Sequence, residues 1–111
     1  MSKIICVSKD FTKTPGARYK TEGPFSGEEF REKYLVPAYE KAEQENETII
    51  VDLDGGYGYP TSFLEEAFGG LARIYSPKDV LKRIEIISED EPALVDEIKA
   101  YIADAKRGDK K

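Results

Sequence analysis

Short apolar runs and longer helical repeats alternate along this chain. The runs at 3–7, 48–53 and 83–87 are rich in isoleucine and valine, which is typical of buried β-strands. Apolar residues recur at helical spacing in three other segments. These are 26–47 (Phe30, Tyr34, Leu35, Ala38, Ala42), 62–74 (Leu64, Ala67, Phe68, Leu71) and 94–105 (Leu94, Ile98, Tyr101, Ile102, Ala105). A short helical turn is expected after Ser76-Pro77, because proline suits the first position of a helix.

This order of strands and helices predicts an α/β domain. Strands that alternate with helices pair in parallel, because each helix returns the chain to the start of the next strand. We expect a sheet of three to four mostly parallel strands, with the helices mainly on one face. A fourth strand would be a short edge strand around Tyr19, paired with the first. Residues 1–111 fit a single domain, and 106–111 are expected to be a frayed, charged tail.

Several residues mark where the helices begin or become irregular. Three pairs have the spacing of a capping box, namely Ser26 with Glu29, Ser62 with Glu65, and Ser88 with Glu91. Pro37 lies inside the first helical repeat and removes a backbone donor, so we expect a kink at 33–36. Gly69-Gly70 costs roughly 1 kcal/mol per glycine in a helix. We therefore expect another backbone to pack closely there, or the helix to tighten or end early.

Composition excludes several kinds of site. The chain has 111 residues and a formal net charge of −5, which opposes general attraction to nucleic acid or anionic membranes. It contains no histidine, which excludes a histidine triad, metal site or proton shuttle. Because Cys6 is the single cysteine, no internal disulfide can form and zinc is not expected. We see no signal peptide and no apolar run near the roughly 20 residues of a membrane helix, so we expect a cytoplasmic protein without metal or other cofactor.

The loop at 54–62 is the first place to look for function, since ligands and partners of α/β sheets meet the loops beyond the carboxyl ends of the strands. Asp52 and Asp54 precede it and point to the same side of the strand. The sequence Ile-Val-Asp-Leu-Asp-Gly resembles the nucleophile motif of haloacid-dehalogenase-like phosphatases, which implies a Mg²⁺-dependent phosphohydrolase. Too few residues follow, however, for the remaining units of that family. Alternatively, Asp54 caps the turn and Asp52 accepts hydrogen bonds from a neighbouring loop.

The same loop carries two hydroxyls and two tyrosines. Thr61 or Ser62 can cap the following helix, and a hydroxyl at an exposed helix N-terminus is also well placed to carry a phosphate. No base lies nearby in sequence that would make either one a nucleophile. Tyr57 and Tyr59 have two interpretations as well. They either contact a partner protein or cover the core of the domain.

Three long stretches of the chain resemble a known family. They are Pro15–Tyr19, Glu22–Arg31 and Tyr57–Leu71. They are similar to the STAS-like domain family of unknown function. The resemblance implies a small STAS-like domain, with the fold of bacterial anti-anti-sigma factors. Some family members occur beside or fused to histidine-kinase-like ATPase domains, which implies a protein partner of that kind.

The resemblance also implies a phosphorylation site. In the wider STAS fold, the segment after the central strand reads Asp-Ser-Ser-Gly-Leu-Gly, and the first serine is phosphorylated in regulators of this kind. In this chain Pro60 takes the place of the Asp, Thr61 that of the phosphoacceptor and Ser62 that of the next serine. The replacement of the Asp by proline is a departure from the pattern that bears directly on such a switch.

These observations together predict a non-catalytic regulatory domain that binds a protein partner and is switched by phosphate on Thr61. The alternatives are the phosphohydrolase at Asp52 and Asp54, and a sensor of small molecules or nucleotides that uses the same loops. The residues predicted to bind the partner are Arg18, Tyr19, Asp54, Tyr57, Tyr59, Pro60, Thr61, Ser62 and Phe63.

Overall fold

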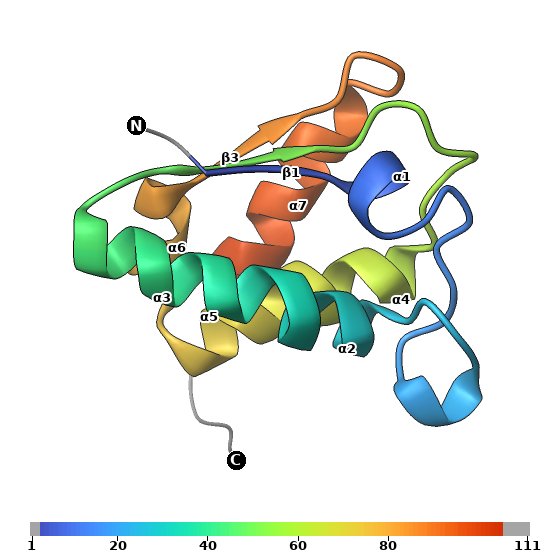
Figure 1. Ribbon diagram of the computed structural model, residues 1–111, viewed down its shortest axis with the longest axis horizontal. Coiled ribbons are helices and arrows are strands. Elements are labelled where there is room, and N and C mark those ends of the chain that lie inside the picture. The colour runs from blue at the N-terminus through green and yellow to red at the C-terminus, as the bar shows by residue number, and fades with distance from the viewer. Residues whose placement is uncertain (1–2, 106–111) are drawn as a thin grey trace.

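Three strands form one parallel sheet, which runs across the upper part of Figure 1. The structure is a computed structural model that describes residues 3–105. The strands are β1 (Lys3–Cys6), β2 (Ile49–Asp52) and β3 (Ile84–Ile87), in the order β1-β2-β3. Both neighbouring pairs are parallel, with Lys3 opposite Ile49 and Ile49 opposite Ile84. The predicted α/β fold with a small, mostly parallel sheet is confirmed.

The predicted edge strand around Tyr19 is wrong. This part of the chain instead enters a short 3₁₀ helix, η1 (Lys20–Glu22). The Glu22 side chain accepts the Tyr19 backbone N–H at 2.9 Å, while the Tyr19 carbonyl accepts the Glu22 N–H at 3.0 Å. These local bonds use backbone groups that a strand would have needed for pairing with β1.

The helices lie mainly on one face of the sheet, below it in Figure 1, as predicted. Two rods are each built from three consecutive segments: α2 (Gly27–Phe30), η2 (Arg31–Leu35) and α3 (Val36–Glu45), then α4 (Thr61–Leu64), η3 (Glu65–Gly69) and α5 (Gly70–Ile74). The remaining helices are α1 (Val7–Asp10), α6 (Pro77–Arg83) and α7 (Ala93–Asp104). Within residues 3–105, no helix is both long enough and apolar enough to cross a membrane.

Burial alternates along the strands as a sheet covered on one face requires. Ile5, Val51 and Ile86 point toward the helices and are buried, whereas Ile4 on the other face is 66% exposed. Aromatic rings fill the space between the two helical rods. The Phe30 ring stacks on the Phe63 ring, with their centroids 5.9 Å apart. This contact joins the rod that starts at Gly27 to the one that starts at Thr61.

Both rods contain a π-helical segment, η2 and η3. The first, at Arg31–Leu35, lies where Pro37 was predicted to disturb the helix. Proline has no N–H to donate one turn back, and a widened turn is one way for a helix to accommodate that loss. The π segment overlaps the region 33–36 in which a kink was predicted, and the helix widens there.

The second π segment ends at Gly69-Gly70, where the prediction of a closely packed backbone is wrong. A Cβ on Gly69 would lie 2.7 Å from Glu65 Oε2, and one on Gly70 would lie 2.4 Å from Arg31 Nη1. The space that the glycines leave is thus filled by charged side chains. The helix neither tightens nor ends at this point, but widens over Glu65–Gly69 and continues as α5.

None of the three predicted capping boxes is complete, although Ser26 does cap its helix while the Glu29 carboxylate accepts the N–H of Phe25 instead of that of Ser26. The Ser26 hydroxyl accepts the Glu29 N–H at 3.0 Å and begins α2. The box at Ser62 is wrong because the helix already begins at Thr61, after Pro60, with no side-chain cap. The box at Ser88 is wrong because its hydroxyl donates to the Glu91 carbonyl and α7 begins only at Ala93.

Candidate functional site

The loop after β2 lies at the carboxyl ends of the strands and is fastened to the loop after β3. The Asp54 carboxylate accepts the backbone N–H of Glu89 at 3.1 Å and that of Asp90 at 2.8 Å. In return, Asp90 Oδ2 accepts the Gly55 N–H at 3.0 Å. Gly55 has φ of +95°, which glycine adopts without strain. These reciprocal bonds fix the direction in which the loop leaves the sheet.

The same loop is held on its other side by the segment that follows β1. The Ser8 hydroxyl donates to the Asp54 carbonyl at 3.0 Å, and the Tyr57 N–H donates to the Lys13 carbonyl at 2.9 Å. In Figure 1 this blue segment runs beside the green loop at the ends of the strands. The sequence analysis missed Ser8, Lys13 and Asp90. They follow strands β1 and β3, so the rule that pointed to the loop after β2 could have found them.

The carboxylates of Asp52 and Asp54 both have structural partners, with their predicted roles exchanged. Asp52 Oδ1 accepts the Asp54 N–H at 2.9 Å and so forms the turn, while Asp54 accepts from the neighbouring loop. Both Asp54 oxygens are engaged by backbone donors. Among residues 3–105 no group of three or more Cys, Asp or Glu side chains is placed to hold a metal ion. The observed bonds therefore give this pair the task of shaping the loop.

The two tyrosines of the loop have different environments. Tyr59 is half-buried, its ring centroid lies 6.0 Å from that of Phe63, and its hydroxyl donates to the Leu53 carbonyl at 2.9 Å. Burial raises the pKa of Tyr59 well above its ordinary value, and the charges of Cys6 and nearby aspartates act in the same direction. Tyr57, by contrast, is 81% exposed. Tyr59 thus covers the core, and Tyr57 remains available to a partner.

Thr61 and Ser62 form the first turn of α4. Thr61 is exposed and Ser62 is partly exposed, so both hydroxyls lie at the surface. The Thr61 side chain lies against Tyr101 of α7, whose hydroxyl donates to Glu97 Oε2 at 2.6 Å. Burial and this bond to Glu97 raise the pKa of Tyr101, whereas the Thr61 side chain acts in the opposite direction. The predicted phosphoacceptor therefore has an aromatic and an acidic neighbour on α7.

Arg18 was predicted to face a partner, but its side chain turns inward to the acidic pair on η3. Its Nη1 donates to Glu65 Oε1 and lies 3.3 Å from Glu66 Oε1. Burial acts to raise the pKa of Glu65, but hydrogen bonds from Arg73 and Arg18 outweigh it and lower the pKa. Arg18 thus anchors its loop to the second helical rod, and its side chain is only 31% exposed.

The segment between Arg18 and α2 presents two aromatic residues. Tyr19 is 46% exposed and Phe25 is 39% exposed. Phe25 has φ of +59°, a left-handed conformation that is costly for a bulky residue. It is held there by the Gly16 N–H, which donates to its carbonyl at 2.8 Å, and by the Glu29 carboxylate, which accepts its own N–H at 3.1 Å.

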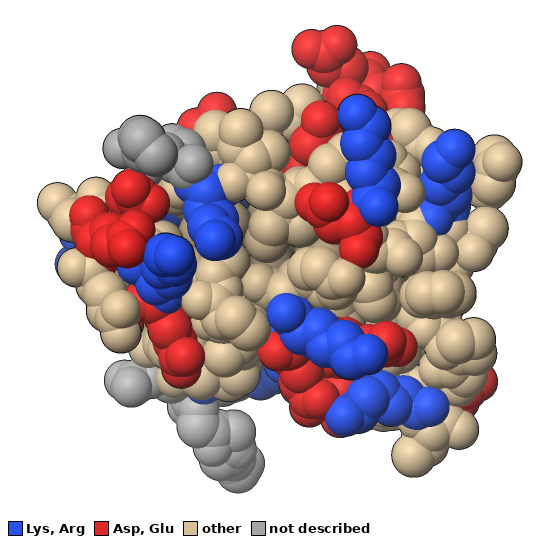
Figure 2. Space-filling model, viewed as in Figure 1, with Lys and Arg blue, Asp and Glu red and all other residues tan. Residues whose placement is uncertain are grey.

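Charged side chains are interleaved over the face drawn in Figure 2. Acidic and basic groups lie beside one another there, and broad uncharged areas separate them. Exposed ion pairs also occur on the domain, such as Lys20 with Glu32, whose charged atoms are 2.6 Å apart. Charge alone therefore does not single out one region of this face, and the exposed aromatic residues are the stronger signal.

Comparison with known proteins adds one finding. A family described as a STAS-like domain of unknown function matches residues 26–94, which include both helical rods, β2, β3 and the loop between β2 and α4. Searches among curated proteins and among solved structures gave no match. The family match and the parallel three-stranded fold agree with the resemblance seen in the sequence. The chain belongs to the family of STAS-like domains of unknown function.

Proposed function

We propose that this domain is a non-catalytic regulator that binds a protein partner, of the histidine-kinase-like ATPase class, at the carboxyl ends of its strands. The surface, here called the partner face, consists of residues 19–25, the loop 54–60, and Thr61 and Ser62 of α4. Phe63, which was also predicted to bind the partner, is fully buried in the core and does not belong to it. The observation that carries the proposal is Tyr57, which is 81% exposed on a loop whose backbone is fixed from two sides. Its ring offers a large contact area, and because the loop backbone is already fixed, little backbone freedom is lost on binding.

The exposed aromatic residues support this location. Among large hydrophobic residues of the described chain, the aromatic ones with substantial exposure are Tyr19, Phe25 and Tyr57. All three belong to the partner face, and aromatic residues are enriched in the cores of protein interfaces. Phe25 is also kept in a costly backbone conformation, and such strain is concentrated at functional positions.

Replacing Tyr57 with alanine is expected to weaken partner binding at least about tenfold, because the variant removes a central aromatic anchor. The fold should be unaffected, since the side chain is exposed. The measurement is affinity capture from the native host followed by binding curves with the captured partner. Leu81→Ala is the matched control, because Leu81 is 37% exposed on α6, outside the partner face. Equal affinity of the Tyr57 variant and wild type would refute the proposal.

Phosphorylation of Thr61 is the proposed switch. Glu65 and Glu66 are paired with arginines, so the acidic neighbour most relevant to a phosphate on Thr61 is Glu97, which Tyr101 connects to it. A phosphate would add up to two negative charges beside this group and at the centre of the partner face. Repulsion from an acidic partner, together with displacement of Tyr101, would then turn binding off.

Thr61→Glu is expected to reduce affinity for the captured partner at least about tenfold, because it places a charge where the phosphate would be. Thr61→Val, which keeps the shape of the side chain without the hydroxyl, should bind like wild type. Mass spectrometry of the protein from its host should detect phosphate on Thr61. Unchanged affinity of Thr61→Glu would remove the switch, while the Tyr57 result would still decide the partner face.

A further inference from the structure

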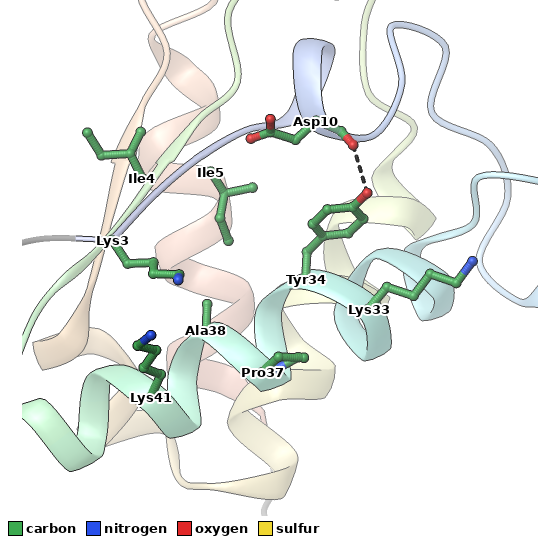
Figure 3. Close-up of a pocket in the computed structure, with 9 residues that line it drawn as sticks. All are labelled: Lys3, Ile4, Ile5, Asp10, Lys33, Tyr34, Pro37, Ala38 and Lys41. Carbon is green, nitrogen blue, oxygen red and sulfur yellow. Dashed lines mark hydrogen bonds between the residues drawn. The ribbon is translucent and has the colours of Figure 1, made fainter.

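A cavity of about 340 Å³ lies between strand β1 and the first helical rod, built from elements other than the partner face. Figure 3 shows the residues that line it, which come from β1, the end of α1, η2 and α3. Its volume falls in the range of pockets that hold small molecules, roughly 300–1,000 Å³. The cavity is partly open to solvent, because β1 is the edge strand of the sheet on this side.

The floor of the cavity is apolar. Ile5 of β1 and Ala38 of α3 are 5% and 4% exposed, and Pro37 lies beside them. The Tyr34 ring forms one wall and is oriented by its hydroxyl, which donates to the Asp10 carbonyl at 2.7 Å. A surface of this kind favours an apolar body of limited size over a fully hydrated ion.

Two lysines supply positive charge at the other end. The side chains of Lys3, from β1, and Lys41, from α3, extend toward one another in Figure 3. Neither forms an ion pair with any other residue in 3–105, whereas Lys33, which also lines the cavity, pairs with Glu29 at 3.0 Å and points away. Two unpaired ammonium groups that converge repel each other, and an anion between them would remove that repulsion.

The acidic residue among those that line the cavity does not neutralise the lysines. Asp10 Oδ2 accepts the Cys6 N–H at 2.8 Å, which ties its carboxylate to the backbone at the end of β1. Figure 3 places Asp10 at the Tyr34 end of the cavity, away from the Lys3 and Lys41 ammonium groups. The cavity therefore combines an apolar floor with a local excess of positive charge, in a chain whose formal net charge is −5.

We propose that this cavity binds a small amphipathic anion. Its carboxylate or phosphate group lies between the ammonium groups of Lys3 and Lys41, and its apolar body packs on Ile5, Pro37 and Ala38. The two ammonium groups supply charge-assisted hydrogen bonds to the anionic group, and the apolar floor selects against inorganic ions that lack a body to bury. The proposal does not depend on the partner face, which is built from other loops.

The test is a titration of the full chain with 4-phenylbutyrate and with 3-phenylpropyl phosphate, which carry the same apolar body, followed by amide NMR shifts. We expect saturable shifts at Ile4, Ile5, Ala38 and Lys41, with a dissociation constant of about 1 mM or below for at least one probe. The neutral 4-phenylbutyramide should bind at least about tenfold more weakly. Which of the two anions binds better identifies the head group. Equal binding of the amide, or shifts confined to other residues, would overturn the proposal.

Substitution of the two lysines provides the second arm. Lys3→Gln/Lys41→Gln is expected to raise the dissociation constant of the anionic probe at least about tenfold, because both ammonium groups are lost. Both side chains are exposed, so the variant should fold. Lys78→Gln/Lys99→Gln, which replaces two exposed lysines on α6 and α7, is the control for the same change in net charge and should bind like wild type. Unchanged affinity in the double variant, or no saturation of wild type by about 10 mM of either probe, would refute the site.

Discussion

Replacing Glu66 with glutamine is expected to reduce the free energy of unfolding by about 3 kcal/mol. Glu66 is 8% exposed, and its Oε2 accepts from Arg31 Nη1 at 2.6 Å. The Arg31 side chain is only 13% exposed, and its Nε has no hydrogen-bond partner. Loss of the Glu66 charge would leave the buried guanidinium with neutral acceptors in place of its counter-ion, namely the amide oxygen of the new side chain and the backbone carbonyl, now at 2.9 Å. Urea unfolding followed by circular dichroism measures this loss.

Glu32→Gln is the matched control for that experiment. Glu32 pairs with Lys20 at 2.6 Å, but both side chains are about half exposed, at 45% and 51%. Exposed ion pairs contribute little, so the control should lose less than about 1 kcal/mol. Added salt should reduce the stability loss of Glu32→Gln more than that of Glu66→Gln, because buried ion pairs are screened much less than exposed ones. Similar losses in the two variants, or a Glu66 effect that vanishes in about 1 M salt, would contradict this account of the cluster.

The elements of the fold could be predicted from the sequence because burial leaves a periodic signal. Ile5, Val51 and Ile86 were recognisable as strand residues, and the rods followed from apolar residues at helical spacing. The packing at Gly69-Gly70 could not be predicted. The group that occupies the space beside Gly70 is the side chain of Arg31, which is distant in sequence and reaches across from the other rod.

The position of the site was predictable, but its internal bonds were not. A loop after the central strand of a parallel sheet must lie at the carboxyl edge, which pointed to 54–62. The donors that engage Asp54 are the backbone N–H groups of Glu89 and Asp90, and such groups are present in every residue and leave no mark in the sequence. For the same reason, Tyr57 and Tyr59 could not be told apart until their burial was known.

Replacing Gly27 with alanine is expected to destabilise the domain by about 2 kcal/mol, although alanine favours helices by roughly 1 kcal/mol over glycine. A Cβ on Gly27 would lie 2.4 Å from the Phe63 carbonyl oxygen and 3.1 Å from the Phe63 Cα. The atoms it meets are backbone, so the clash is relieved only if α2 and α4 move apart. Urea unfolding again measures the loss, with Gln44→Ala on the exposed face of α3 as a control that should stay within about 0.5 kcal/mol.

The same substitution should disturb the partner face from inside. Gly27 follows the strained Phe25, and Phe63 belongs to the turn that carries Thr61, so the contact of Gly27 with Phe63 joins the two halves of that surface. We therefore expect the amide NMR signals of Thr61 and Phe63 to shift in Gly27→Ala and to stay in place in Gln44→Ala. If Gly27→Ala is as stable as wild type and leaves those signals unmoved, the close approach of the two rods does not set the geometry of the site.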